Sequence, residues 1–148
     1  MSQIVLGSPA PLRSCPAAST IFPALPVPPC RFCSGSFCLR VEPRLLSLWW
    51  APGAVLGLTD VAGAAEVIRD VSDGYRLPLV VHLQGMVGIA AAARTLILES
   101  SLSSRIAYVG TGPVDQVIAA FLDQGLSETR YFECPRAAQE WALGGRDG

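Results

Sequence analysis

Four of the five cysteines lie within the first 38 residues and form the densest set of metal-binding side chains in the sequence. Cys30, Cys33 and Cys38 are spaced as Cys-x2-Cys-x4-Cys, and Cys15 lies upstream. Four thiolates can hold a zinc ion, but structural zinc sites pair two short clusters across a loop. Because Cys15 is isolated and no histidine is near, we expect neither a metal nor another cofactor. A disulfide is an open alternative to the reduced thiols that we predict for a cytoplasmic protein.

Nucleophilic catalysis needs a base within hydrogen-bonding distance of a hydroxyl or thiol. The only histidine, His82, lies in an apolar stretch, where it fits a strand better than an active site. Cys134 precedes the last predicted helix, whose amino terminus would stabilise a thiolate, but the sequence offers it no base. The twelve acidic residues are scattered, and no Gly-x-Ser-x-Gly motif is present. We therefore predict that the chain is not an enzyme.

Gly110, Thr111 and Gly112 lie between a predicted strand and a predicted helix, a place where free backbone amides bind anions. These three residues are a candidate anion-binding site. The third glycine of a dinucleotide-binding motif would fall at Asp115, whose charge would repel a pyrophosphate. The alternative is structural: the glycines permit a tight turn, and Asp115 favours the positive end of the helix.

Composition and charge limit the class of protein. A chain of 148 residues with 51% hydrophobic and 16% charged side chains can form one compact domain and has little room for a second. The formal net charge is −1, without the basic excess typical of proteins that bind DNA or RNA. The uncharged stretch between Arg76 and Arg94 contains a proline and two glycines and is short for a bilayer. We expect no nucleic-acid partner and no membrane span.

The amino-terminal segment differs in composition from the rest. The first 41 residues contain no Asp or Glu and seven of the twelve prolines, which disfavour helices and internal strands. We predict that residues 1–36 are a tail, either disordered or added by a wrongly assigned start. One domain would then cover residues 37–144, followed by a short tail over 145–148.

The domain is predicted to alternate strands and helices. Apolar runs predict a hairpin of two strands over residues 37–41 and 45–50. Apolar residues at helical spacing predict a helix with Thr59 as N-cap and an end at Asp73 and Gly74. The nearly continuous apolar run over 77–83 is typical of a central strand that is buried on both faces.

The alternation continues to the carboxyl end. We predict a loop over 84–88, helices over 89–99, 113–124 and 135–143, and strands over 105–109 and 129–132. In the middle one of these helices, five side chains are expected to share the face that packs inward: Val114, Val117, Ile118, Phe121 and Leu122. The order β-β-α-β-α-β-α-β-α predicts an α/β fold with a mixed, mostly parallel sheet.

Seven short segments, taken in order, carry a resemblance to a known family. They are Leu45-x-x-Leu48-Trp49-Trp50-Ala51-Pro52-Gly53, Leu77-Pro78-Leu79-Val80-Val81-x-Leu83-x-Gly85, Ala93-Arg94, Ser104-Arg105-Ile106-Ala107, Val117-Ile118-Ala119, Thr129-Arg130-Tyr131-Phe132 and Trp141-Ala142-Leu143. Together they resemble the STAS-like, or SpoIIAA-like, single-domain bacterial proteins, in particular an uncharacterised branch. The similarity covers about residues 38–144 and implies a sheet with helices packed mainly on one side.

The resemblance also implies a regulatory protein that binds another protein. Better-known relatives antagonise anti-sigma factors, and a kinase switches them by phosphorylating a Ser or Thr at the start of the helix after the central strand. The corresponding residues 84–91 contain no hydroxyl, so an anti-sigma-factor antagonist is an alternative here rather than the prediction.

We predict a cytoplasmic, non-enzymatic interaction module, because loops carried on a rigid sheet are favoured recognition sites. The predicted interaction surface consists of Gln84, Gly85, Met86, Val87, Gly88, Ala90 and Arg94. One alternative is a binder of a small apolar or lipid-like ligand, held in a cavity between the sheet and the helices. A homodimer is a further alternative.

Overall fold

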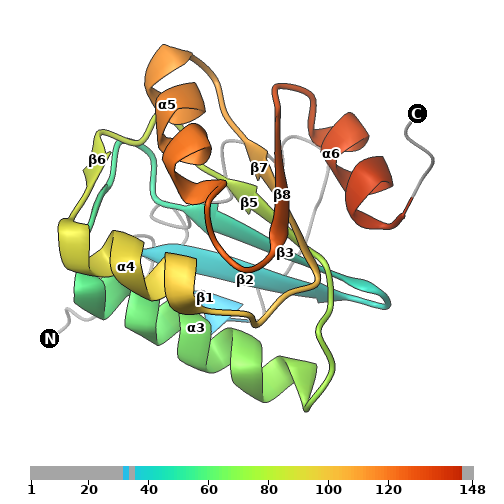
Figure 1. The fold of residues 1–148 in the computed structure, drawn as a ribbon. Helices are drawn as coiled ribbons and strands as arrows, with labels where there is room; N and C mark the ends of the chain where they lie inside the picture. The colour runs from blue at the N-terminus through green and yellow to red at the C-terminus, as the bar shows by residue number, and fades with distance from the viewer. Residues whose placement is uncertain (1–31, 34–35, 145–148) are drawn as a thin grey trace, which may run out of the picture.

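The computed structural model describes residues 32–33 and 36–144 (Figure 1). Within these ranges the chain forms eight strands and four helices. The strands are β1 (Phe32–Cys33), β2 (Phe37–Glu42), β3 (Leu45–Trp50), β4 (Val55–Leu56), β5 (Leu79–His82), β6 (Gly88–Ile89), β7 (Arg105–Val109) and β8 (Glu128–Phe132). The helices are α3 (Leu58–Ser72), α4 (Ala91–Glu99), α5 (Pro113–Leu122) and α6 (Pro135–Ala142).

Six strands form one sheet in the order β1-β2-β3-β5-β7-β8. The first three pair antiparallel, and β3, β5, β7 and β8 run parallel. β5 lies inside the sheet and Val80 at its middle is fully buried, because an apolar run without polar alternation suits a strand covered on both faces. The predicted mixed, mostly parallel sheet is confirmed.

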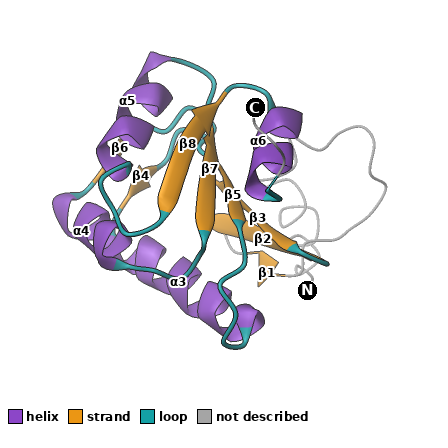
Figure 2. Ribbon diagram, turned by 45° about the vertical axis from the view of Figure 1, so that its right-hand side comes forward, coloured by secondary structure: helices purple, strands orange, loops and turns teal. Residues whose placement is uncertain are grey.

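Helices cover the two faces of the sheet unequally (Figures 1 and 2). α3, α4 and α5 pack on one face, which we call the three-helix face. α6 packs on β5, β7 and β8 from the opposite side, which we call the α6 face. Strand alternation divides the side chains of β3 accordingly: Leu46, Leu48 and Trp50 join the core under the three helices, and Leu45 joins the core under α6.

The sheet begins earlier than the sequence predicted. β1 lies within the segment that we expected to be a tail, and it pairs with β2 so that Cys33 lies opposite Cys38. The main sheet therefore includes residues assigned to the tail. Residues 1–31, 34–35 and 145–148, and with them Cys15 and Cys30, lie outside the described residues, so what we predicted there stays a prediction.

Two further boundaries differ from expectation. β4 and β6 pair in parallel as a separate two-stranded sheet. Gly88 of β6 was expected in the loop over 84–88 and Ile89 in the helix over 89–99, which begins at Ala91 instead. α3 begins at Leu58, and its N-cap is Gly57 rather than Thr59. The Asp60 carboxylate accepts a hydrogen bond from the Gly57 amide at 2.9 Å, and an acidic residue in the first turn also suits the positive end of the helix.

Candidate functional site

The loop that follows β5 is held in a fixed shape. Gln84 and Gly85 both have positive φ angles, 56° and 70°, which turn the chain sharply at the end of the strand. The Gln84 side-chain amide donates to the carbonyl oxygen of Trp50 at 2.8 Å. Three residues later, the Val87 amide donates to the carbonyl oxygen of Ala54 at 2.8 Å. The loop is therefore tied to the end of β3 and to the segment that follows it.

A buried carboxylate ties the same loop to the start of α5. Asp115 is 1% exposed, and its two oxygens accept hydrogen bonds from the backbone amides of Gly85 and Met86, at 2.9 and 2.8 Å. The Thr111 amide donates to it as well, at 2.9 Å. Three backbone amides from two separate loops thus donate to one carboxylate. These hydrogen bonds replace those to water that the carboxylate loses when it is buried.

This arrangement bears on the candidate anion site at Gly110, Thr111 and Gly112. The Thr111 amide already bonds the Asp115 carboxylate, and Gly112 is the N-cap of α5. At Gly110 a Cβ atom would lie 2.5 Å from the Cβ of Asp115 and 2.7 Å from the ring of Tyr131, so only glycine fits. Close packing thus explains Gly110, while anion binding at these residues stays a prediction.

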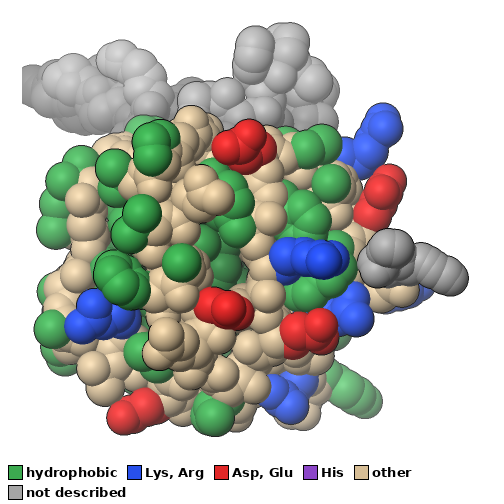
Figure 3. Space-filling view, turned by 45° about the horizontal axis from the view of Figure 1, so that its top comes forward, with side chains coloured by type: hydrophobic (Ala, Val, Ile, Leu, Met, Phe, Trp, Pro, Cys, Tyr) green, Lys and Arg blue, Asp and Glu red, His purple; other side chains and the backbone are tan. Residues whose placement is uncertain are grey.

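An open apolar groove lies beside the loop. It runs between β6 and the start of α4 on one side and α5 on the other. Hydrophobic side chains gather in the left half of Figure 3, where α5 lies, and charged side chains are more frequent in the right half. Four large apolar side chains of the groove are about half exposed or more: Val87 (65%), Val114 (53%), Val117 (53%) and Phe121 (48%).

Arg94 is the charged residue in the lining of this groove. Its guanidinium carbon lies 5.6 Å from the centre of the Phe121 ring, within the range of a cation–π contact. Among the residues that the structure describes, no carboxylate forms an ion pair with Arg94. The groove therefore combines an apolar floor with a single positive charge.

The structure sorts the predicted interaction residues into three groups. Val87, Gly88 and Arg94 line the groove, and Ala90 is exposed next to it. Gln84 and Gly85 make the turn that shapes the loop. Met86 is 1% exposed and belongs to the core under the three helices, so its assignment to the surface is wrong. The Met86 amide donates to the Asp115 carboxylate, and the next residue of the loop, Val87, is 65% exposed.

Three residues of the groove lie on the part of α5 that was expected to pack inward. Ile118 and Leu122 of α5 are buried as predicted, but Val114, Val117 and Phe121 are exposed. The buried face of α5 also includes Asp115 and Ala119. A signal was present: the apolar side chains of this helix occupy too wide an arc for one inward stripe, so some of them had to face outward.

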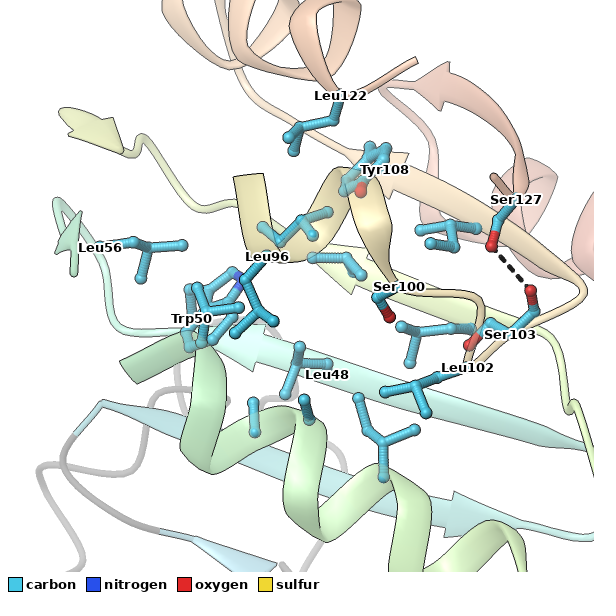
Figure 4. Close-up of a pocket in the computed structure, with 18 of the residues that line it drawn as sticks. Leu48, Trp50, Leu56, Leu96, Ser100, Leu102, Ser103, Tyr108, Leu122 and Ser127 are labelled. Atoms are coloured by element: carbon cyan, nitrogen blue, oxygen red, sulfur yellow. Dashed lines mark hydrogen bonds between the residues drawn. The ribbon is translucent and has the colours of Figure 1, made fainter. Parts of the chain in front are cut away.

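A second feature is a largely apolar cavity of about 80 Å³ between the sheet and the three helices (Figure 4). Leu48, Val81 and Tyr108 line it from the sheet, Ala64 from α3 and Leu96 from α4. None of the described residues in its lining is Asp, Glu, Arg or His. Burial raises the pKa of the Tyr108 hydroxyl, to which the charge of Asp123 adds, so the phenol is neutral as well.

Three serines, Ser100, Ser103 and Ser127, gather at one end of the cavity, away from Leu56 and Trp50 (Figure 4). The Ser127 hydroxyl donates to the carbonyl oxygen of Ser103 at 2.8 Å. The Ser103 hydroxyl is itself buried, and no described residue forms a hydrogen bond with it. No local pattern predicted this polar end, because these serines come from two loops that only the fold brings together.

A stack of side chains lies on the α6 face. The Trp49 and His82 rings are nearly parallel with centres 4.4 Å apart, and the Arg40 guanidinium carbon lies 5.6 Å from the Trp49 ring centre. Burial lowers the pKa of His82 to about 4, so the imidazole is neutral at pH 7. His82 lies in a strand, as the sequence indicated. Cys134 is exposed and is the N-cap of α6.

The described residues show neither a cluster of metal ligands nor a membrane-spanning helix. In residues 32–33 and 36–144, no group of three or more His, Cys, Asp or Glu side chains is placed to hold a metal ion. None of the helices in the same ranges has the length and apolar character needed to cross a bilayer.

Comparison with known proteins adds evidence on the fold. Neither a protein-family model nor a curated protein sequence matches the chain. Among solved structures, the chain is similar to an uncharacterised protein of the DUF3478 family with a SpoIIAA-like fold, from Shewanella loihica PV-4. The two have a TM-score of 0.51 and 13% sequence identity, over 72% of this chain and 91% of that chain. Similarity at this level establishes architecture and leaves function to the site. We conclude that the chain has a SpoIIAA-like fold, as the resemblance in its sequence predicted.

Proposed function

We propose that the chain is a non-enzymatic, cytoplasmic interaction module that binds a protein partner through the groove between β6, α4 and α5. The observation that supports this is the exposure of Val87, Val114, Val117 and Phe121 along one groove. Single exposed apolar residues are ordinary on protein surfaces, but a contiguous set of them is typical of a binding surface. The hydrogen bonds of Asp115 hold the loop that supplies Val87, so the surface needs little reordering on binding.

The lining of the groove indicates the chemistry of the partner. An apolar segment would cover the exposed valines and the Phe121 ring, and an acidic side chain in it would pair with Arg94. Such a charge pair would be partly shielded from water by Phe121 and would fix the register of the segment. We therefore expect a partner segment with apolar side chains and at least one carboxylate.

The first test is site-specific photo-crosslinking in the producing cell, with a photoreactive amino acid at Val117. Gln116 is the matched control, because it is exposed on the same helix one residue away and does not line the groove. We expect a defined crosslinked protein from position 117 and none from position 116. Equal crosslinking from both positions, or none from position 117, would contradict the proposal.

The crosslinked protein is then purified and its affinity for the chain is measured. Phe121→Asp should abolish binding, Arg94→Glu should weaken it at least tenfold, and Gln116→Asp should leave it within twofold. A product of twice the chain mass identifies a homodimer, and the sequence of a crosslinked partner shows whether it is an anti-sigma factor. Retention of binding by Phe121→Asp would refute the groove as the interface.

A second candidate function is supported by a different observation, the apolar cavity of about 80 Å³ under the three helices. We propose that it holds a small apolar ligand, because apolar cavities in proteins stay dry and bind such molecules. Xenon under pressure is a suitable probe, read from amide shifts in the NMR spectrum of the full chain. Saturable shifts at cavity residues such as Ala64 and Leu96, which are absent in an Ala64→Leu variant, would support binding. Their absence in the native chain would contradict it.

A further inference from the structure

The polar end of the cavity determines what kind of ligand suits it. Ser103 is 2% exposed, and its hydroxyl has no hydrogen-bond partner among the described residues. Its backbone is held in place, because its carbonyl oxygen accepts hydrogen bonds from the Ser127 hydroxyl at 2.8 Å and from the Arg76 guanidinium at 3.2 Å. A fixed backbone with an unused hydroxyl at the wall of a cavity is a preformed contact for a ligand atom.

Water is a poor occupant of most of this space. A buried water molecule usually needs two to four polar partners, and the cavity offers them only at the end where Ser100, Ser103 and Ser127 gather, whereas leucine, isoleucine and valine side chains make up most of the remaining wall. Leaving the hydroxyl without any partner is also unfavourable, since a buried polar group loses its hydrogen bonds to solvent. A ligand that fills the apolar space and also reaches Ser103 would satisfy both requirements.

Charge and size narrow the class of ligand. Among the residues that the structure describes, no acidic or basic side chain lines the cavity, so a carboxylate or an ammonium group would be buried without a counter-charge. The volume of about 80 Å³ is roughly half that of an engineered apolar cavity of about 150 Å³ that holds benzene. A ligand that fits without rearrangement therefore has only a few heavy atoms, comparable with a three-carbon or four-carbon alcohol or ketone.

We infer that the cavity is a binding site for a short, neutral molecule with an apolar body and one hydroxyl or carbonyl group, which forms a hydrogen bond with the Ser103 hydroxyl. The inference rests on the second candidate function, since it names the ligand class of the same cavity. The cavity is distinct from the groove, because Ile89 is the only described residue that lines both.

The experiment uses the full chain labelled with nitrogen-15 and two probes of similar size, 1-propanol and xenon. Propanol carries a hydroxyl and xenon does not, so their comparison isolates the polar contact. Ser103→Ala removes the hydroxyl, and Ser101→Ala is the matched control, because Ser101 is an exposed serine two residues away that does not line the cavity. Ala64→Leu fills the apolar space, and Ala65→Val is a milder filling variant should the first fail to fold.

We expect saturable propanol binding that Ser103→Ala weakens about tenfold, the loss typical of one hydrogen bond. Xenon affinity should stay within twofold in Ser103→Ala, and Ser101→Ala should change neither affinity. The filling variants should weaken both probes. Unchanged propanol affinity in Ser103→Ala would overturn the polar contact while xenon binding still supports the cavity. Failure of both probes in the native chain would overturn the ligand site together with the second candidate function.

Discussion

The two faces of the sheet bury different kinds of side chain. Under α3, α4 and α5 the core is apolar and contains a cavity, and an exposed apolar groove lies between β6, α4 and α5. On the α6 face, the buried side chains of β3 and β5 include Ser47, Trp49 and His82. The three-helix face therefore offers apolar space to a ligand or partner. The stability of the α6 face, in contrast, depends on the His82 imidazole staying neutral.

The sharpest test of the three-helix face is Met86→Asp, for which we expect the largest effect. Met86 is 1% exposed in the core, so the substitution buries a charge without a partner next to the Asp115 carboxylate. We expect a loss of about 5 kcal/mol in the free energy of unfolding, or failure to fold, because unpaired buried charges are among the most destabilising changes. Urea unfolding followed by circular dichroism measures it. A loss below about 1 kcal/mol would place Met86 on the surface after all.

Asp115→Ala tests the bond between the loop after β5 and α5. The substitution leaves the amides of Gly85, Met86 and Thr111 without their acceptor. We expect a loss of about 3 to 4 kcal/mol in the free energy of unfolding, since each buried donor without a partner costs about 1 to 3 kcal/mol. Gln116→Ala, an exposed position on the same helix, is the control and should change stability by less than about 0.5 kcal/mol. Equal losses in the two variants would count against the bonds.

The α6 face predicts a dependence of stability on pH. His82 is the only histidine, and its pKa falls from 6.5 in the unfolded chain to about 4 in the fold. As the pH falls from about 6.5 to about 4, the unfolded chain binds a proton that the folded chain does not, so the fold loses stability throughout this window. The loss attributable to His82 is about 3 kcal/mol, because each pKa unit corresponds to about 1.4 kcal/mol.

The measurement is urea unfolding at pH 7 and pH 4.5 for the native chain and for His82→Phe. Phenylalanine keeps an aromatic ring to stack on Trp49 and removes the titration. The variant should lose clearly less stability than the native chain between the two pH values. If both lose the same amount, the imidazole is not the group that responds.

The smallest effect on stability is expected for Val87→Asp, the residue next to Met86. Val87 is 65% exposed, so the charge stays in water and the free energy of unfolding should change by less than about 0.5 kcal/mol. Binding of the crosslinked partner should nevertheless be lost, because an aspartate would place a charge in the apolar groove. A stable Val87→Asp variant that binds the partner normally would show that the groove is not the interaction surface.

The sequence predictions were accurate where a pattern of apolar residues extends over many residues. Long apolar runs such as that of β5 and helical spacing such as that of α3 correctly predicted the alternation of these strands and helices along the chain. The two-residue strands β4 and β6 carry no period, so nothing in the sequence marked them. The face of α5 was misjudged because its apolar arc is wide.

The site was less predictable than the fold for a different reason. The orientations of Met86 and Val87 depend on Asp115, which lies far along the chain, and a hydrogen bond between distant residues leaves no local pattern. Ser103 and Ser127 meet at the cavity for the same reason: each ends a separate helix-to-strand connection, and only the parallel strands bring them together. Tertiary contacts of this kind decide what a surface or a cavity can bind.

The shared acceptor at Asp115 also determines which part of the molecule can be transplanted. The loop over 84–87 takes its shape from a carboxylate on α5, and that carboxylate is held in turn by the amide of Thr111. A protein engineer who moves the loop alone onto a new scaffold would leave its two amides unsatisfied and its Val87 unsupported. The smallest segment that can be transferred is therefore the loop together with the stretch from Gly110 through the first turn of α5. Both stretches of chain have to be moved together.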